Sequence, residues 1–130
     1  METTKVITPY FEDDAFAGVR VCIGDEDFVI APRDYKGGKT MTLHKAIDAL
    51  MADNLTIWNF RQICLTMAYR KEIDKILKDN GGDSLDKTYL TSAEHTTYYI
   101  YIYNGNINIL DVFHKSYIWS VRPIKNLNKE

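Results

Sequence analysis

The feature of this sequence that most constrains its fold is a run of strand-forming residues at 98–103, which reads Tyr-Tyr-Ile-Tyr-Ile-Tyr. Tyrosine and isoleucine are enriched in strands because they suit a pleated, half-buried surface. Asn104, Gly105 and Asn106 follow directly, and 107–112 continues with further strand-forming residues. Asn-Gly between two such runs is typical of a tight turn, because both residues readily adopt positive φ. The pattern therefore predicts an antiparallel hairpin in the C-terminal half.

Further strands are expected on either side of this hairpin and near the N-terminus. The segment 88–92 precedes the hairpin and 117–124 follows it, so the C-terminal part is predicted to be an antiparallel β-meander. Two short apolar runs at 19–23 and 28–31 are joined by a Gly-containing acidic turn, which predicts a short N-terminal hairpin. We expect 1–17 to form an irregular or edge segment.

Two helices are expected between the strands, where apolar residues recur at helical spacing. The first begins after Thr42, a suitable N-cap, and runs to about Asp53. Thr66 is the expected cap of the second, which ends at Asn80, before a glycine that supplies the left-handed C-terminal residue. Strands and helices are segregated along the chain, and this order is typical of the α+β class.

Length and composition are those of one ordinary globular domain. The chain has 130 residues, of which 45% are hydrophobic and 26% charged, so we expect a single domain over 1–130 with a polar tail at 125–130. Sixteen Lys+Arg against eighteen Asp+Glu give a net charge of -2, which does not favour nucleic-acid binding, since that function usually needs a clearly basic face.

Targeting signals are not visible in the sequence. No apolar run approaches the ~20 residues that a membrane helix needs, so membrane insertion is not expected. The N-terminal residues lack the apolar stretch of a signal peptide, and this favours a cytoplasmic or virion-associated protein.

A glycine-rich segment, Gly-Gly-Lys-Thr at 37–40, lies between a predicted strand and a predicted helix, as a phosphate-binding P-loop does. The full motif also needs a glycine five residues before Gly38, so that the backbone can wrap a phosphate. That position holds Arg33. The segment is therefore interpreted as a flexible loop.

Cysteine and histidine do not form a pattern that predicts catalysis or metal binding. Cys22 and Cys64 are expected to be two buried thiols rather than a disulfide. His44, His95 and His114 lack the helical i, i+4 spacing of metal ligands. We therefore expect no metal, no cofactor and no enzyme, although a small enzyme that uses Cys64 with a histidine stays open as the less favoured alternative.

The tyrosines of the predicted strand give a second alternative. Tyr99, Tyr101 and Tyr103 share one face, because alternate strand residues point the same way. Such a face packs against a neighbouring strand, stacks on a base or sugar, or joins two subunits. No basic cluster adjoins it, so we favour packing. A structural or oligomerising protein that uses this Tyr-rich face, as a homo-oligomer, remains the alternative.

Four C-terminal segments together resemble a known family. They are Tyr-Leu-Thr-Ser-Ala-Glu at 89–94, Tyr-Tyr-Ile-Tyr-Ile at 98–102, Asn-Gly-Asn-Ile at 104–107 and Tyr-Ile-Trp-Ser-Val-Arg-Pro-Ile at 117–124. An uncharacterised bacterial and phage domain family has Tyr-Trp-Ser-Ser-Thr-Glu, an aromatic strand, Asn-Gly and a closing Val-Arg-Pro-Val. It is related to the C-type-lectin-like fold of the formylglycine-generating-enzyme group. The variable ligand-binding proteins of diversity-generating retroelements share that fold.

The resemblance extends more loosely upstream. Lys-Thr-Met-Thr at 39–42 is similar to the family's Met-Thr-Trp-x-x-Ala helix start, with Leu43 in place of tryptophan and Ala46 retained. The calcium-dependent sugar motifs of C-type lectins and the copper-binding cysteine pair of formylglycine-generating enzymes have no match. The resemblance therefore implies a C-type-lectin-like domain with two helices, a C-terminal β-meander and a short N-terminal hairpin. It also implies a non-enzymatic binding module, part of a phage-derived or surface-displayed assembly, whose partner is an unknown protein or glycan.

Binding on such a scaffold is expected to use loop side chains. The candidate ligand-binding residues lie between the last predicted strands: Asn106, Asn108, Asp111, Phe113, His114, Ser116 and Tyr117. Four others are given structural roles: Asn104 and Gly105 as the hairpin turn, and Glu94 and Arg122 as charges placed for burial. A buried charge needs a partner. We therefore hypothesise that Arg122 contacts Glu94 or nearby carbonyls and ties the last strand to the start of the sheet.

Overall fold

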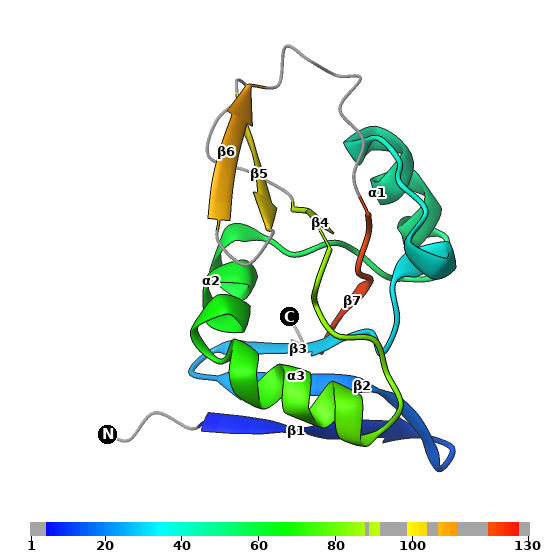
Figure 1. Cartoon of the computed structure of the whole chain (residues 1–130), viewed down its shortest axis with the longest axis vertical. Coiled ribbons are helices and arrows are strands. Elements are labelled where there is room, and N and C mark those ends of the chain that lie inside the picture. Colours follow the sequence, from blue (N-terminus) through cyan, green and yellow to red (C-terminus); the bar gives the residue numbers. More distant parts are fainter. Residues whose placement is uncertain (1–4, 88, 92–98, 104–106, 112–119, 128–130) are drawn as a thin grey trace.

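The computed structural model describes residues 5–87, 89–91, 99–103, 107–111 and 120–127. Its larger sheet is fully antiparallel and has the strand order β1-β2-β3-β7 (Figure 1). The four strands are β1 (Lys5–Glu12), β2 (Ala15–Ile23), β3 (Glu26–Ile30) and β7 (Ile124–Asn126).

The predicted N-terminal hairpin forms the centre of this sheet, and β1 extends it at the edge. The chain reverses between β1 and β2 at Asp13 and Asp14, which both adopt positive φ, of 49° and 65°. Aspartate tolerates this conformation in tight turns better than most residues do. The acidic run at 12–14 thus contains a hairpin turn. Residues 5–12 form the edge strand of the sheet, one of the two alternatives expected for 1–17, with a shift in register between Tyr10 and Phe11.

The described residues form three α-helices where two were predicted: α1 (Leu43–Met51), α2 (Phe60–Ala68) and α3 (Arg70–Asp79). A short 3-10 helix, η1 (Tyr35–Gly38), precedes them. Thr42 caps α1 as predicted, because its side chain accepts a hydrogen bond from the Lys45 backbone N–H. The prediction for Thr66 was wrong. Asn59 caps α2 instead, in a reciprocal capping box with Gln62.

Thr66 lies inside α2, where its hydroxyl donates to the Gln62 carbonyl and accepts from the Trp58 indole N–H. The backbone leaves helical geometry at Tyr69, with φ of -115°, and this break separates α2 from α3. The structure therefore has two helices, α2 and α3, where the sequence predicted a single helix that ends at Asn80.

The smaller sheet has the order β4-β5-β6, with strands β4 (Tyr89–Leu90), β5 (Tyr99–Tyr103) and β6 (Ile107–Asp111). The predicted hairpin is confirmed by the antiparallel pairing of β5 with β6. The prediction of a strand at 117–124 was wrong for residues 120–123, which are described and lie outside any strand. Ser120 makes only a bridge to Tyr89, and β7 begins at Ile124 and pairs with β3 in the larger sheet. Residues 125 and 126 accordingly belong to a strand rather than to a tail.

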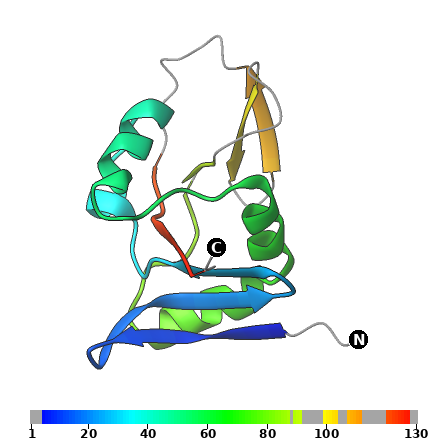
Figure 2. The same cartoon turned by 180° about the vertical axis from the view of Figure 1, so that it is seen from behind.

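The three helices do not lie on one side of the larger sheet. Figures 1 and 2 show α2 and α3 over one face of it, whereas α1 and the β5–β6 hairpin lie beyond its β7 side. α3 lies against β1 and β2. The arrangement is a mixed α+β fold, as the segregation of elements predicted.

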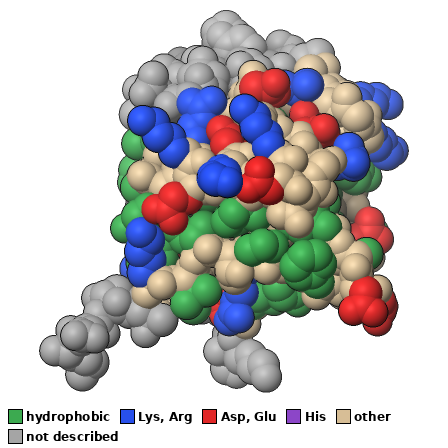
Figure 3. All heavy atoms as spheres, turned by 60° about the horizontal axis from the view of Figure 1, so that its bottom comes forward, with side chains coloured by type: hydrophobic (Ala, Val, Ile, Leu, Met, Phe, Trp, Pro, Cys, Tyr) green, Lys and Arg blue, Asp and Glu red, His purple; other side chains and the backbone are tan. Residues whose placement is uncertain are grey.

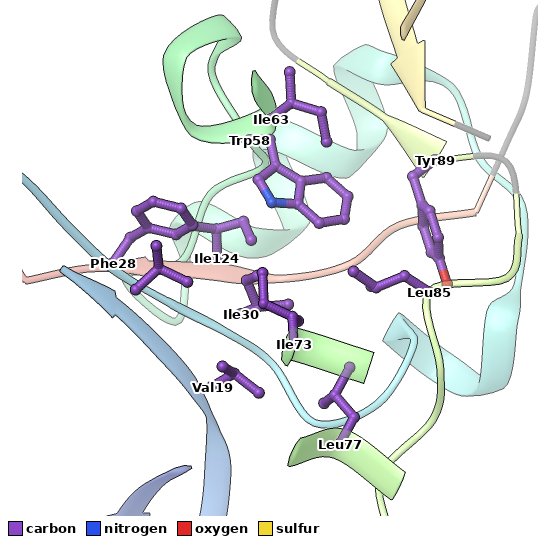
Figure 4. Packing of buried hydrophobic residues seen from close by; sticks show 11 residues of the cluster. Val19, Phe28, Ile30, Trp58, Ile63, Ile73, Leu77, Leu85, Tyr89 and Ile124 are labelled. Carbon is purple, nitrogen blue, oxygen red and sulfur yellow. The ribbon is translucent and has the colours of Figure 1, made fainter. Parts of the chain in front are cut away.

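The main core fills the space between the larger sheet and the two helices that cover it (Figure 4). It buries alternate residues of β2 and β3, including Phe28, one face of α2 and α3, and the rings of Trp58 and Tyr89. Its residues include Val19, Val21, Phe28, Ile30, Trp58, Ile63, Ile73, Leu77 and Tyr89. A second cluster joins α1 to the chain around β4: Ala46, Leu50, Ile57, Leu90 and Val121.

The opposite face of the larger sheet is more polar. Arg20 alternates with the buried Val19 and Val21, and it donates two hydrogen bonds, of 3.0 and 2.8 Å, to the carboxylate of Asp27 on β3.

The bottom of Figure 1, brought forward in Figure 3, shows charged side chains of both signs above a group of hydrophobic ones. Two of the exposed hydrophobic residues, Val6 and Phe11, belong to the edge strand β1.

Candidate functional site

A buried charged cluster organises the middle of the molecule, with Arg122 at its centre. No part of Arg122 is exposed. Its guanidinium donates to the Asp34 carboxylate at 2.8 Å and to the carbonyls of Ala31 at 2.8 Å and Pro32 at 3.1 Å. It also donates to the Asp83 carbonyl. The planar guanidinium carries five N–H donors, so one side chain can satisfy several acceptors from separate segments.

The carboxylate of Asp34 is the common acceptor of this cluster. Its side chain is 2% exposed and lies 3.3 Å from the ammonium of Lys87 in addition to its contact with Arg122. The phenol of Tyr89 donates to the same carboxylate at 2.6 Å. A buried carboxylate is tolerated when cations and hydrogen-bond donors surround it.

Tyr89 is held in its neutral form by this environment. Burial raises the pKa of its phenol well above the usual range, and the hydrogen bond to Asp34 acts in the same direction. The ring also packs edge-on against Trp58, with the centroids 5.6 Å apart. Tyr89 therefore serves as a hydrogen-bond donor inside the core.

The cluster places the two ends of residues 92–119 beside each other. Leu90 N donates to Ser120 O at 3.1 Å, and Tyr89 and Ser120 form a parallel bridge. Thr91 and Ser120 are both buried. Tyr89 precedes residues 92–119 and Arg122 follows them, and both side chains contact Asp34. The segments on either side of residues 92–119, at 89–91 and 120–122, are thus two adjacent, buried stems.

The predicted ligand-binding residues that the structure describes lie on β6. Asn108 is opposite Ile102 and Asp111 is opposite Tyr99 in the register of the hairpin. The other predicted binding residues lie outside the described part of the chain: Asn106, Phe113, His114, Ser116 and Tyr117. Three predicted structural residues also lie outside it: Glu94, Asn104 and Gly105.

Arg122 is the predicted structural residue whose contacts are described. Three carbonyls are among its acceptors, and its carboxylate partner is Asp34, which was not predicted. Asp34 lies 88 residues before Arg122 and follows a strand that ends in a proline-containing loop. No local pattern in the sequence distinguishes it from the other acidic residues of the chain.

The cysteines and His44 are all in the part of the chain that is described. Cys22 and Cys64 are both free, as predicted, but half-buried rather than buried. The His44 side chain is 90% exposed and lies 3.5 Å from Asp48. Within the described ranges, no three His, Cys, Asp or Glu residues are grouped as metal ligands would be.

Two further findings concern the chain as a whole. In the described residues, no helix is both long enough and apolar enough to cross a bilayer. The chain matches no protein-family model, and a search among curated proteins finds no match.

Proposed function

We propose that the protein is a non-enzymatic binding module, in which a compact scaffold displays residues 92–119 to a ligand. The observation that carries this proposal is the pairing of the two stems at Leu90 and Ser120. The proposal includes a C-type-lectin-like domain whose ligand is a protein or glycan, within a phage-derived or surface-displayed assembly.

Separation of scaffold from displayed segment supports this function. The polar groups buried in the described core bond to one another and to backbone carbonyls, so Arg122 and Asp34 act in holding the scaffold together. Binding residues are often carried by loops that a rigid framework positions. Two stems that are fixed to each other anchor the segment between them, whose strand β5 also pairs with β4.

The residues proposed to contact ligand all belong to this segment. Asn108 and Asp111 lie on the β6 strand of the hairpin. Asn106, Phe113, His114, Ser116 and Tyr117 complete the proposed set. Asn, Ser, His and Tyr offer adaptable hydrogen bonding and aromatic contact area, as in antibody loops.

The test replaces residues 92–119 by a Gly-Ser linker. Because the stems run parallel at Tyr89 and Ser120, the linker must turn back, and about six residues suffice for this return. Wild type and the linker variant are both applied to an array of immobilised glycans and peptides, and cooperative thermal unfolding is measured for both.

We expect the wild type to bind a subset of the array. The linker variant should unfold cooperatively but should not bind. An Asn108→Ala, Asp111→Ala double variant should weaken binding in the intact chain. Two results would overturn the proposal: wild type that binds nothing on the array, or array binding that survives removal of the segment.

A further inference from the structure

A cavity of about 310 Å³ lies between the loop that follows β3 and the first turns of α1. Its polar lining is Tyr35, Lys36, Lys39, Thr40, Thr42 and Lys45. All of these residues precede β4 and therefore lie outside the displayed segment. Small-molecule sites have volumes of roughly 300–1,000 Å³, and this cavity lies at the lower end of that range.

The charged residues in the described lining are all lysines. Lys36, Lys39 and Lys45 are exposed, and none has an ion-pair partner among the described residues. Residues 35–47 contain no Asp or Glu, although the chain as a whole has a net charge of -2. Three ammonium groups around one hollow repel one another, and an anion between them would remove that cost.

Several other lysines pair with carboxylates within the fold. Lys75 lies 2.8 Å from Asp79, Lys5 lies 3.2 Å from Glu72, and Lys125 lies 3.3 Å from Glu12. Among the described residues, no carboxylate lines the cavity. Lys71 and Lys78 on α3 also have no ion-pair partner in the described part of the chain, so what distinguishes the cavity is that its three lysines line one hollow.

Hydroxyl donors complement the lysines. The Oγ1 of Thr42 accepts a hydrogen bond from the Lys45 backbone N–H, which leaves its own O–H available to a ligand. Thr40 lines the same hollow. α1 also begins at this wall and has no acidic residue in its first turn, so its positive end acts in the same direction as the lysines.

The loop that carries Lys36 and Lys39 is fixed by the core. Tyr35 N donates to the Val121 carbonyl at 2.8 Å, and the Ser120 hydroxyl donates to the Gly38 carbonyl at 3.0 Å. The lysines consequently project from an anchored backbone, which lowers the entropy cost of gathering them around a ligand.

We propose that this cavity binds an oxyanion group, phosphate or sulfate, carried by a sugar-sized molecule. The lysines would contact the anionic oxygens and the threonine hydroxyls would donate to them. A single phosphate leaves much of the volume unfilled, so the remaining space would take the attached ring. The Gly-Gly-Lys-Thr segment contributes here through Lys39 and Thr40, without the backbone wrap of a P-loop.

The experiment is a titration of the full chain followed by amide NMR at low ionic strength. The probes are glucose 6-phosphate, glucose 6-sulfate, inorganic phosphate and, as the uncharged match, glucose. We expect the phosphorylated or sulfated sugar to shift amides of residues 35–49, and glucose to leave them unchanged. Comparison of the two charged sugars identifies which oxyanion the cavity prefers.

Two triple variants distinguish binding at the cavity from attraction by the net charge of the protein. Lys36→Gln, Lys39→Gln, Lys45→Gln should weaken binding of the charged sugar by on the order of tenfold for each lysine that contacts it. Lys71→Gln, Lys75→Gln, Lys78→Gln removes the same number of charges from exposed positions of α3 and should leave the affinity within about twofold.

Several outcomes would overturn the site. Equal losses in the two triple variants would mean that net charge, rather than the cavity, attracts the anion. Equal affinity for inorganic phosphate and glucose 6-phosphate would exclude a sugar-sized ligand. An absence of shifts at 35–49 with every charged probe would exclude the site. None of these results depends on whether the displayed segment binds its own ligand.

Discussion

The guanidinium of Arg122 donates a 2.8 Å hydrogen bond to the carboxylate of Asp34, 88 residues away in the chain, and both side chains are shielded from water. The contact joins the end of the chain to the loop after β3. Removal of one member of such a pair leaves the other charge buried without compensation.

Substitution of Asp34 should therefore be strongly destabilising. Asp34→Asn removes the charge that balances Arg122 and Lys87, and we expect a loss of about 3–5 kcal/mol in the free energy of unfolding. Urea denaturation followed by circular dichroism measures this loss. Asp86→Asn is the matched control, because the Asp86 side chain is 69% exposed and should change stability by less than about 1 kcal/mol. Similar losses in the two variants would contradict a stabilising role for the buried pair.

Tyr89→Phe should have a smaller effect at neutral pH. The variant keeps the ring that packs against Trp58 and removes only the phenol that donates to Asp34 at 2.6 Å. A hydrogen bond to a charged group contributes about 1.5–3 kcal/mol, so we expect a loss in this range. Urea midpoints of the variant and wild type measure it. Unchanged stability would indicate that Asp34 does not depend on this donor.

Tyr89 should also make the free energy of unfolding depend on pH in the alkaline range. The folded-state pKa of Tyr89 is raised above its unfolded value of about 10, so the unfolded state loses its proton first as pH rises. The contribution of Tyr89 is therefore complete below about pH 10 and declines above it, by up to about 1.4 kcal/mol per pH unit. Wild type and Tyr89→Phe, denatured in urea between pH 8 and about pH 11, should converge in stability as pH rises. Parallel curves would rule out this linkage.

Two glycines with positive φ should respond differently to alanine. Gly18 has φ of +136°, and an added Cβ would lie 2.2 Å from the Ile30 carbonyl oxygen, inside the sheet. Gly18→Ala should cost about 3 kcal/mol or more, from backbone strain and overpacking together. Gly37 has φ of +70° with open space around its Cβ position, so Gly37→Ala should cost only about 1 kcal/mol. Thermal melts of both variants test the difference, and equal shifts would show that the close approach at Gly18 is relieved by a small movement.

The capping box of α2 gives a further prediction. Asn59→Ala removes the side chain that accepts from the Gln62 N–H, and we expect a loss of about 1 kcal/mol. Asn59→Ser retains an acceptor oxygen and should restore most of the stability in the same denaturation assay. If serine is as destabilising as alanine, packing at this position matters more than the cap.

Local elements were predicted where short-range interactions decide them. Thr42 caps α1 through a hydrogen bond to a residue three positions away, and the strand-forming runs around Asn104 and Gly105 pair as a hairpin. The start of α2 was missed because Asn59 and Gln62 were not interpreted as a capping box, although that signal is local. The turn at Asp13 and Asp14 was missed because an acidic run is also typical of a solvated segment.

The sequence by itself determined the α+β class, the cap of α1 and the β5–β6 hairpin, because neighbouring residues are sufficient to favour each. Tertiary structure alone decided that β7 pairs with β3, that Arg122 meets Asp34, and that three lysines surround one cavity. The Arg122–Asp34 contact and the grouping of the three lysines both depend on how segments that are distant in the sequence pack together. A pattern within one segment carries no information about which carboxylate, out of many, the folded chain brings to a buried arginine.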